Sequence, residues 1–247
     1  MIKATYTTTD KTHIEIIEFI KKRKEKNPSY KVIDLGGGLN GWSADIVDLI
    51  IDINVPDSPS TLQMDICDES NYQKILNFVA ANGLFDYCIC THTLEDLYNP
   101  FLPLKYMPRI AHAGVITMPT IMDELSPVQS LSWNGYIHHR WMFDFLDGKI
   151  FIIPKIKSLE AFLGVKMSRI KGTEIKFEWE RNIPYDVFMR NYLGPDLRTV
   201  ASELNKVVQR LNAQARGVYF FRNRHTRSAR ILMRLVRFVR MKVGIKL

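Results

Sequence analysis

The sequence predicts an α/β fold in which a mostly parallel, doubly wound sheet is covered by helices on both faces. Short apolar segments of strand type alternate with segments of helical spacing, and this alternation is typical of β–α–β units. A glycine-rich run, VIDLGGG, follows directly on the first of these strands. The expected strands are 31–38, 49–54, 60–66, 85–91 and 113–119, with helices expected at 68–82 and 94–111.

The flanking elements complete one expected domain, residues 1–215. An amphipathic helix capped by Asp10 or Thr12 precedes the first strand, and Pro28 forbids its continuation. In the polar and aromatic stretch 124–144, apolar residues follow neither the spacing of a helix nor the alternation of a strand. An insertion of about 120–149 is therefore expected to be rich in loops. The remaining predictions are strands at 150–154 and 174–180, a short helix near 156–163 and a helix at 196–214.

The net positive charge of the chain arises at its C-terminus. The chain has 247 residues and a net charge of +8, yet no Asp or Glu follows Glu203. Ten Lys or Arg lie in residues 216–247, which leaves 24 basic and 26 acidic side chains in the preceding part. Arginines spaced by three or four predict a basic amphipathic helix at 226–243.

Such a tail has several uses. It can lie on an anionic membrane surface, bind nucleic acid, pack on a protein partner, or form an ordinary solvated helix. We favour membrane or protein contact over nucleic acid, because the rest of the chain is slightly acidic. Without a signal peptide or a run of eighteen apolar residues, we expect a cytoplasmic protein, peripheral to a membrane at most. Cys67, Cys88 and Cys90 are expected to be reduced core residues.

The glycine turn and an acid before it suggest the ligand. Gly36, Gly38 and Gly41 fit the pattern G-x-G-x-x-G after a strand, which also suits a dinucleotide. Asp34 would repel a pyrophosphate, whereas S-adenosylmethionine (SAM) brings an ammonium and a sulfonium. The sequence therefore favours SAM over NAD or FAD.

Two further acids lie at successive strand ends. Asp52 ends the second strand and can bind both hydroxyls of a ribose. Asp65 can accept from an adenine amino group beside the backbone of Ile66. The simpler alternatives are a strand-end turn for Asp52 and a helix cap for Asp65, a cap that Asp68 could equally supply.

These segments together resemble the class I SAM-dependent methyltransferases of small-molecule type. The resemblance covers about residues 30–120 and rests on VIDLGGG (32–38), Asp52, MDI (64–66) and FDYCICTHTLEDLYNP (85–100). Asn40 stands where many members have a third glycine, and Asp96 replaces the second histidine of an H-x-L-E-H turn. The HHRW stretch (138–141) is also similar to uncharacterised members.

The resemblance implies a Rossmann-like, seven-stranded sheet with SAM at the carboxyl ends of the strands. It implies a set of cofactor contacts. These are Asp34, Gly36, Gly37 and Gly38 around the methionine part, Asp52 at the ribose, Asp65 and Ile66 at the adenine, and Thr91 with His92 near the sulfonium.

The acceptor side is expected to use a histidine base. Methyl transfer to a hydroxyl requires positioning and removal of a proton. His92, His138 and His139 are the candidates, and we favour the pair, of which at most one should face the ligand if the segment is extended. The expected acceptor is a small molecule or a glycan-like molecule.

Neighbouring side chains are expected to complete that site. Arg140 would bind an acidic group, and Trp133 and Tyr136 would supply contact area. The alternative is a structural lid in which these residues simply pack. We expect no metal, because two adjacent histidines rarely reach one ion, and we interpret Glu95 and Asp96 as acids at a helix start.

Two other functions remain open. A non-catalytic SAM-fold module could bind a membrane or a partner through its C-terminal helix. An RNA methyltransferase would bind RNA in a salt-sensitive manner.

Overall fold

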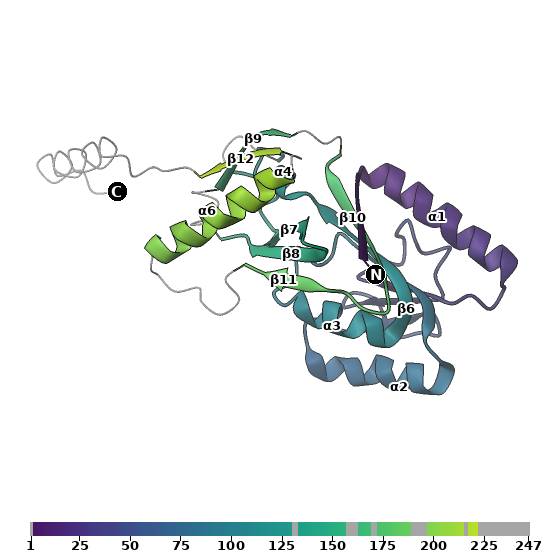
Figure 1. The fold of residues 1–247 in the computed structure, drawn as a ribbon. Coiled ribbons are helices and arrows are strands. Elements are labelled where there is room, and N and C mark those ends of the chain that lie inside the picture. The colour runs from purple at the N-terminus through teal and green to yellow at the C-terminus, as the bar shows by residue number, and fades with distance from the viewer. Residues whose placement is uncertain are drawn as a thin grey trace, which may run out of the picture.

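The central feature of the protein is a mostly parallel sheet with helices on both faces (Figure 1), as the sequence predicts. The computed structural model describes residues 2–129, 133–156, 163–168, 172–188, 197–214 and 217–221. In spatial order the sheet contains β4 (Thr61–Gln63), β3 (Leu49–Asp52), β2 (Val32–Leu35), β5 (Phe85–Thr91), β6 (Ala111–Pro119), β10 (Glu174–Glu180) and β1 (Ile2–Thr7).

The first five strands of that order are parallel to one another, and β10 is antiparallel to both of its neighbours. The chain leaves β2 for β3 and β4 on one side and then crosses to β5 on the other side. The order of strands therefore reverses between β2 and β5. In open α/β sheets, ligands bind at the carboxyl ends of the strands at this switch point.

Alternating side chains on the strands create two separate cores. Val32 and Ile89 face helix α1 (Thr9–Lys26), which buries Ile16 and Ile20 against them. Ile33 and Leu35 face the opposite side, where α2 (Tyr72–Asn82) and α3 (Phe101–Ile110) pack. Period-two alternation on a strand places successive side chains on opposite faces, so one apolar run supports both layers. Cys88 and Cys90 are free thiols buried in the second core, as expected.

The first helix begins earlier than expected. Thr8 is its N-cap residue, in place of Asp10 or Thr12, and the helix ends at Lys26 with Asn27 as the C-cap. Thr12 lies inside the helix, where its hydroxyl donates to the carbonyl of Thr8 at 3.0 Å.

The helix expected at 94–111 is shorter than expected, because α3 begins only at Phe101. Pro100 precedes it, and a residue before proline is disfavoured in the helical region. The expected helix at 68–82 is present as a short 3-10 turn (η1, Glu69–Asn71) followed by α2. Glu95 and Asp96 therefore lie in a turn and not at a helix start, which corrects our interpretation of them.

The expected loop-rich insertion contains regular structure. A short helix, α4 (Ile121–Glu124), follows β6, and β7 (Trp141–Leu146) forms a hairpin with β8 (Lys149–Pro154). Asp147 and Gly148 connect the two strands with positive φ angles of 50° and 76°. An Asp-Gly pair between apolar runs is a strong hairpin signal, and sequence reasoning missed it. With β11 (Tyr185–Val187), the hairpin makes a second sheet of order β11-β8-β7.

The C-terminal part packs against this second sheet. The helix α6 (Leu197–Ala213) agrees with the predicted one, and its apolar side joins a core that contains Met142, Phe151 and Tyr219. Two more strands, β9 (Leu163–Ser168) and β12 (Gly217–Phe221), pair antiparallel. Residues 217–221, which we assigned to the tail, thus belong to the folded body.

Two predicted helices lie wholly or mostly outside the described residues. They are the basic helix at 226–243 and most of the helix near 156–163, whose last residue, Leu163, is the first of β9. Within the described ranges, no helix combines the length and apolar character needed to cross a membrane.

Candidate functional site

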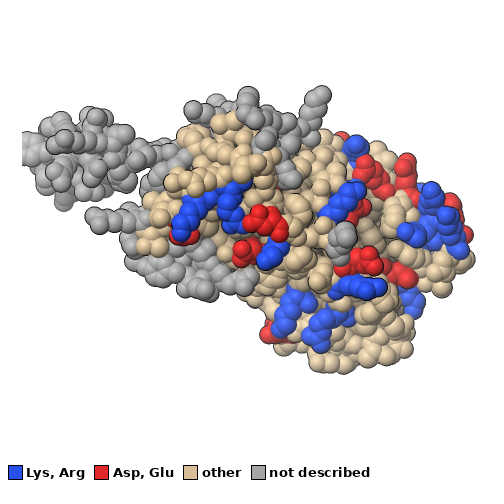
Figure 2. All heavy atoms as spheres, in the orientation of Figure 1, with Lys and Arg blue, Asp and Glu red and all other residues tan. Residues whose placement is uncertain are grey.

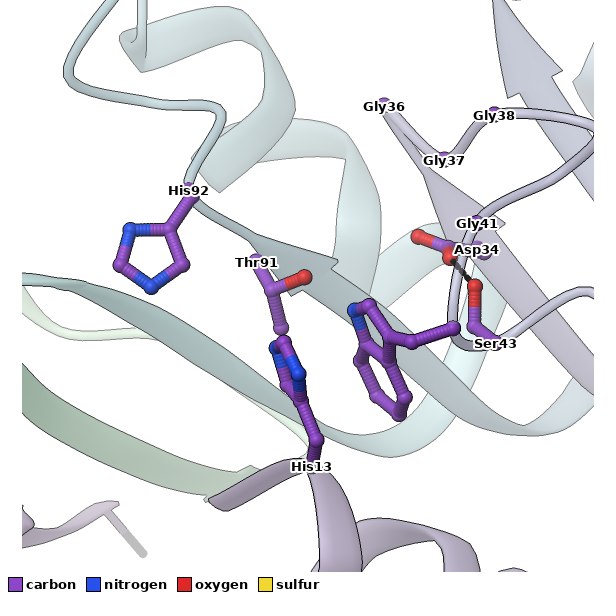
Figure 3. Close-up of a pocket in the computed structure, with 10 residues that line it drawn as sticks. His13, Asp34, Gly36, Gly37, Gly38, Gly41, Ser43, Thr91 and His92 are labelled. Carbon is purple, nitrogen blue, oxygen red and sulfur yellow. Dashed lines mark hydrogen bonds between the residues drawn. The ribbon is translucent and has the colours of Figure 1, made fainter. Parts of the chain in front are cut away.

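A cavity of about 240 Å³ lies at the switch point of the sheet. Figure 3 shows the glycine turn after β2 on one side of it and the end of β5 on the other, with His13 of α1 between them. The lining residues are His13, Asp34, Gly36, Gly37, Gly38, Gly41, Trp42, Ser43, Thr91 and His92. Of the residues predicted to contact the cofactor, Asp34, the three glycines and Thr91 therefore meet around one space, with His92 beside them.

Asp34 is the charged group of the glycine turn. Its side chain is 2% exposed, and one carboxylate oxygen accepts a short hydrogen bond from the Ser43 hydroxyl. Burial raises the pKa of Asp34 to about 6, an effect that the Ser43 bond reduces and the charge of Asp52 reinforces. The site therefore holds a desolvated carboxyl group whose ionised form would be stabilised by a cationic ligand.

The turn needs glycine at two positions. Gly36 has a φ angle of 91°, and a Cβ there would lie 2.5 Å from the Thr93 side chain. At Gly37 a Cβ would lie 2.4 Å from a carboxylate oxygen of Asp34. By contrast, a Cβ at Gly38 would have no atom within 4 Å. The first two glycines keep the turn close to β2 and Asp34, and the third leaves open space beside the backbone.

His13 and Trp42 form a wall of the cavity that sequence reasoning missed. Their rings stack with centroids 4.2 Å apart. Burial lowers the pKa of His13, and the nearby His92 lowers it further against the opposing charge of Glu174. The His13 Nε2 atom is buried without a hydrogen-bond partner. Nothing in the sequence around His13, which lies in an N-terminal amphipathic helix, indicates that this side chain lines a cavity.

The two other predicted acids lie along the same edge of the sheet. Asp52 ends β3 and is partly exposed, and its side chain accepts from the backbone N–H of Asn54 at 2.7 Å. Asp65 follows β4 and accepts from the N–H of Cys67 at 2.8 Å. Asp68, and not Asp65, caps the next helical turn, where it accepts from the N–H of Ser70. The cap alternative for Asp65 is therefore wrong.

Ile66, the backbone candidate at the adenine, follows Asp65 and is buried. Its carbonyl accepts from the Tyr72 hydroxyl at 2.9 Å. This bond ties the segment after β4 to the start of α2.

His92 lies between two buried acids. Its Nε2 is 2.5 Å from Glu174 of β10, and its Nδ1 is 3.3 Å from Glu95. Burial opposes the charged form, but the two carboxylates outweigh it and raise the pKa of His92 to about 10. Burial likewise opposes the charge of Glu174, and its bonds to His92 and nearby threonines nevertheless lower the pKa of that carboxyl. His92 is therefore a cation at neutral pH, which makes it unsuitable as a general base.

The segment that carries the other histidines lies beside the turn after β5. The backbone N–H groups of Arg140 and Trp141 donate to the carbonyl of Glu95 at 2.6 and 3.3 Å. The Trp141 indole N–H donates to the carbonyl of Leu97 at 2.8 Å. The insertion thus contacts the turn that follows the carboxyl end of β5.

His139 is held by a buried ionic network. Its Nδ1 lies 2.6 Å from Glu124, which is 1% exposed. The other oxygen of Glu124 lies 2.5 Å from the ammonium of Lys155, which also donates to the carbonyl of Tyr136 at 2.5 Å. Gly135, with a φ angle of 59°, approaches Glu124 so closely that a Cβ would lie 2.4 Å from its carboxylate.

His138 and His139 converge, contrary to expectation. The expected divergence assumed an extended segment, but residues 137 and 138 form a turn. Both Nε2 atoms lie 3.8 Å from the same oxygen of Asp96. His138 is exposed, whereas the side chain of His139 is nearly buried.

The three predicted acceptor contacts lie on the same segment. Tyr136 stacks on His139 with ring centroids 4.6 Å apart. The side chains of Trp133 and Arg140 are exposed. Tyr136 thus supports the histidine, while the other two are open to solvent.

Comparisons with known proteins give only distant likenesses. No family model matches the chain, and no curated protein matches it. Similar solved structures include the methyltransferase domain of bacterial CtHen1, with a TM-score of 0.37, 11% identity, and coverage of 68% of this chain and 97% of that chain. The N-terminal domain of EvdMO1 with SAH and D-fucose has a TM-score of 0.28, 14% identity, and coverage of 65% and 79%. The same domain with SAH bound has a TM-score of 0.25, 14% identity, and coverage of 76% and 69%.

Proposed function

We propose that this protein is a SAM-dependent methyltransferase that acts on a small-molecule or glycan-like acceptor. The observation that carries the proposal is the cavity at the switch point, where the buried Asp34 carboxyl and the glycine turn meet Thr91. A cationic amino-acid group gains from a desolvated carboxylate, whereas a pyrophosphate would be repelled. This chemistry distinguishes SAM from NAD or FAD at the same turn.

The residues present fit the shape of such a cofactor. A volume of about 240 Å³ is smaller than the whole site of a drug-sized ligand, which takes roughly 300–1,000 Å³. It suits the methionine part, bounded by Asp34, the glycines and the His13–Trp42 wall. The remainder would extend along the sheet edge, with the ribose at Asp52 and the adenine at Asp65 and Ile66. When bound, SAM supplies an electrophilic methyl group on a sulfonium.

The protein's own part in the reaction is to position the acceptor and accept a proton. The insertion places His138, His139 and Arg140 beside the turn that follows Thr91 and His92. His139 has the orientation of a histidine held by a carboxylate, through Glu124. Arg140 is open to bind an acidic group of the acceptor. The His92 cation contributes positive charge and holds β10 to the turn after β5.

A small acceptor fits the surface better than RNA does. Figure 2 shows Lys and Arg beside Asp and Glu on the face it presents, and not as a continuous basic surface. Several charged side chains of the described residues also pair with one another, as Arg210 does with Asp147 and Lys105 with Glu69. RNA-binding surfaces concentrate positive charge. The binding-module and RNA alternatives therefore have less support.

The test is calorimetric titration of the full chain with SAM and, separately, with NAD. SAM should bind, NAD should not, and Asp52→Ala should weaken SAM by roughly tenfold or more through lost charge-assisted hydrogen bonds. Asp45→Ala is the matched control, because Asp45 is an exposed acid near the turn that does not line the cavity. Absence of SAM binding at millimolar ligand would contradict the proposal, as would equal losses in the two variants.

A further inference from the structure

We propose that Asp96, His138 and His139 form a binding site for a divalent transition-metal ion. Each residue offers one ligand atom, and these atoms all lie within 4.8 Å of one another. The set combines two imidazole nitrogens and one carboxylate oxygen. This donor set suits ions such as Zn²⁺, Co²⁺, Mn²⁺ or Fe²⁺ better than Mg²⁺ or Ca²⁺, which prefer oxygen alone.

The spacing requires only a small closure around an ion. Both histidine Nε2 atoms lie 3.8 Å from the Asp96 oxygen. Two ligand atoms that are each about 2.1 Å from a tetrahedral ion lie about 3.4 Å apart. Because the side chains of Asp96 and His138 are 43% and 55% exposed, they can move this far without repacking the core.

A buried carboxylate sets the tautomer of His139. Glu124 lies 2.6 Å from the Nδ1 atom and is paired on its other oxygen with the Lys155 ammonium. A carboxylate in such a pair can only accept, so Nδ1 carries a proton, and in the neutral imidazole Nε2 then presents its lone pair. Metal-binding histidines are oriented in this way by a carboxylate on the far nitrogen.

That lone pair faces Asp96, which also has only lone pairs to offer. Two acceptors that face each other at 3.8 Å repel, unless a positive charge lies between them. A metal ion explains this arrangement and also explains why His138 converges on the same oxygen.

The backbone holds the three ligands in place. The carbonyl of Glu95, next to Asp96, accepts from the N–H groups of Arg140 and Trp141. The N–H of Asp96 donates to the carbonyl of Thr93 at 3.2 Å. The turn that carries Asp96 and the segment that carries both histidines are therefore fixed to each other, as a preorganised site requires.

The exposure of this cluster leaves room for a further ligand. Three protein ligands and an open position are typical of catalytic metal sites. Asp96 follows His92 of the cavity by four residues, which limits the separation of their Cα atoms to about 14 Å. If the proposed methyltransferase function holds, the role of the ion rests on it: the ion would bind the acceptor hydroxyl and lower its pKa, so that the proton passes to water and His139 serves as a ligand in place of a general base.

The experiment measures metal binding alone, without SAM. Full-length protein without an affinity tag is treated with chelator and titrated with Co²⁺, followed by calorimetry and by visible absorption. We expect one equivalent to bind, with the absorption of a nitrogen- and oxygen-ligated ion. Asp96→Asn, His138→Asn and His139→Asn should each weaken metal binding by about tenfold or more. Loss of a hydrogen-bond partner behind a ligand typically costs about 10–100-fold in metal affinity, and loss of the ligand itself should cost at least as much.

Two further variants separate the site from general effects. His112→Asn removes another exposed histidine, on β6, and should leave binding unchanged. Glu124→Gln should weaken binding by about 10–100-fold, because it no longer fixes the tautomer. Circular dichroism checks that each variant is folded, and Asp96→Asn and His138→Asn change exposed side chains only.

The outcomes decide the proposal without reference to methylation. Failure of the intact protein to bind Co²⁺ or Zn²⁺ would overturn it. Equal affinity in the wild type and the three ligand variants would overturn it as well. Binding of metal without binding of SAM would support this site and contradict the proposed function, whereas the reverse result would do the opposite.

Discussion

At the scale of single residues, Asp34 shows a conflict between stability and ligand binding. Its carboxyl is buried, and the raised pKa of about 6 means that ionisation is easier in the unfolded chain. The unfolded state then binds fewer protons than the native state between about pH 4 and 6, so stability falls as the pH rises through that window. A cationic ligand would recover the lost free energy.

The first prediction concerns Asp34→Asn. At pH 7.5 this change should raise the free energy of unfolding of the ligand-free protein by up to about 3 kcal/mol, the equivalent of two pKa units. It should also weaken the binding of SAM by roughly tenfold or more, because the negative charge that pairs with the cationic ligand is gone. Urea unfolding and calorimetry measure the two effects, with Asp45→Asn as the exposed control. A variant that is less stable and binds SAM normally would refute this role.

The second prediction concerns His92. Its raised pKa of about 10 means that the native state keeps a proton that the unfolded chain loses above its usual value of 6.5. This stabilisation is complete below about pH 6.5 and is lost as the pH rises toward 10. His92→Gln should therefore be less stable than the wild type at pH 6.5, and the difference should shrink by pH 10. Urea unfolding across this range tests it, and a difference independent of pH would contradict it.

At the scale of elements, sequence reasoning succeeds for the parallel sheet and its helices and fails for the insertion. Strands of the parallel sheet follow from short apolar runs, because helices cover both faces of the sheet. The helices α2 and α6 follow from apolar periodicity, because each buries one face. The β7–β8 hairpin carried a local signal in Asp147 and Gly148. It was missed because the aromatic residues before β7 hid the strand pattern.

Other features had no local signal. The edge strand β1 is partly exposed and rich in threonine, and it is defined by its pairing with β10 about 170 residues later. The contact of His92 with Glu174 joins residues 82 positions apart, and Glu124 contacts His139 from the other end of the insertion. The strand ends predicted that the cofactor candidates lie along one edge of the sheet, because the carboxyl ends of parallel strands share that edge. Side-chain partners across the fold required the structure.

The third prediction tests the insertion through two glycines of positive φ. Gly135→Ala places a Cβ within 2.4 Å of Glu124, whereas Gly148→Ala meets no atom within 4 Å. Both changes carry the strain of a left-handed alanine, about 1–2 kcal/mol. Only the first should also displace Glu124 from His139 and thereby reduce metal binding. Thermal unfolding, SAM titration and Co²⁺ titration should show SAM affinity unchanged in both variants.

The interpretation of the insertion depends on the contrast between these two variants. Equal metal affinity would mean that the contact of Gly135 with Glu124 does not position His139. A loss of SAM affinity in Gly135→Ala would mean that the insertion and the cofactor cavity are one mechanical unit.

At the scale of the whole molecule, charge and fold are divided along the chain. The part before Arg216 holds nearly equal numbers of basic and acidic side chains, and the net charge of +8 arises from the residues after it. The described structure ends in β12, whose Tyr219 is 3% exposed and packs in the core with α6. The folded body therefore extends at least to Phe221, which moves its boundary with the basic segment past Gly217.

The fourth prediction uses this boundary. A chain that ends at Phe221 should fold like the full-length protein and keep its affinity for SAM, because the residues of the cavity and of the apolar cores all lie before that end. A chain that ends at Ala215 should lose about 2–4 kcal/mol of stability, since it removes Tyr219 from the core and exposes the apolar side of α6. Urea unfolding of the two truncations against the full chain measures this difference.

The same pair of truncations tests what the basic segment binds. We expect the full chain to sediment with vesicles that contain anionic phosphatidylserine, and the chain ending at Phe221 to lose this binding while it retains SAM. Arginines on an amphipathic helix each add about 1 kcal/mol at such a surface, and salt should weaken them. If the shorter chain instead loses SAM affinity, the basic segment is part of the catalytic body. If both chains ignore vesicles and the full chain binds RNA in a salt-sensitive manner, the acceptor is to be sought among nucleic acids and not among small molecules.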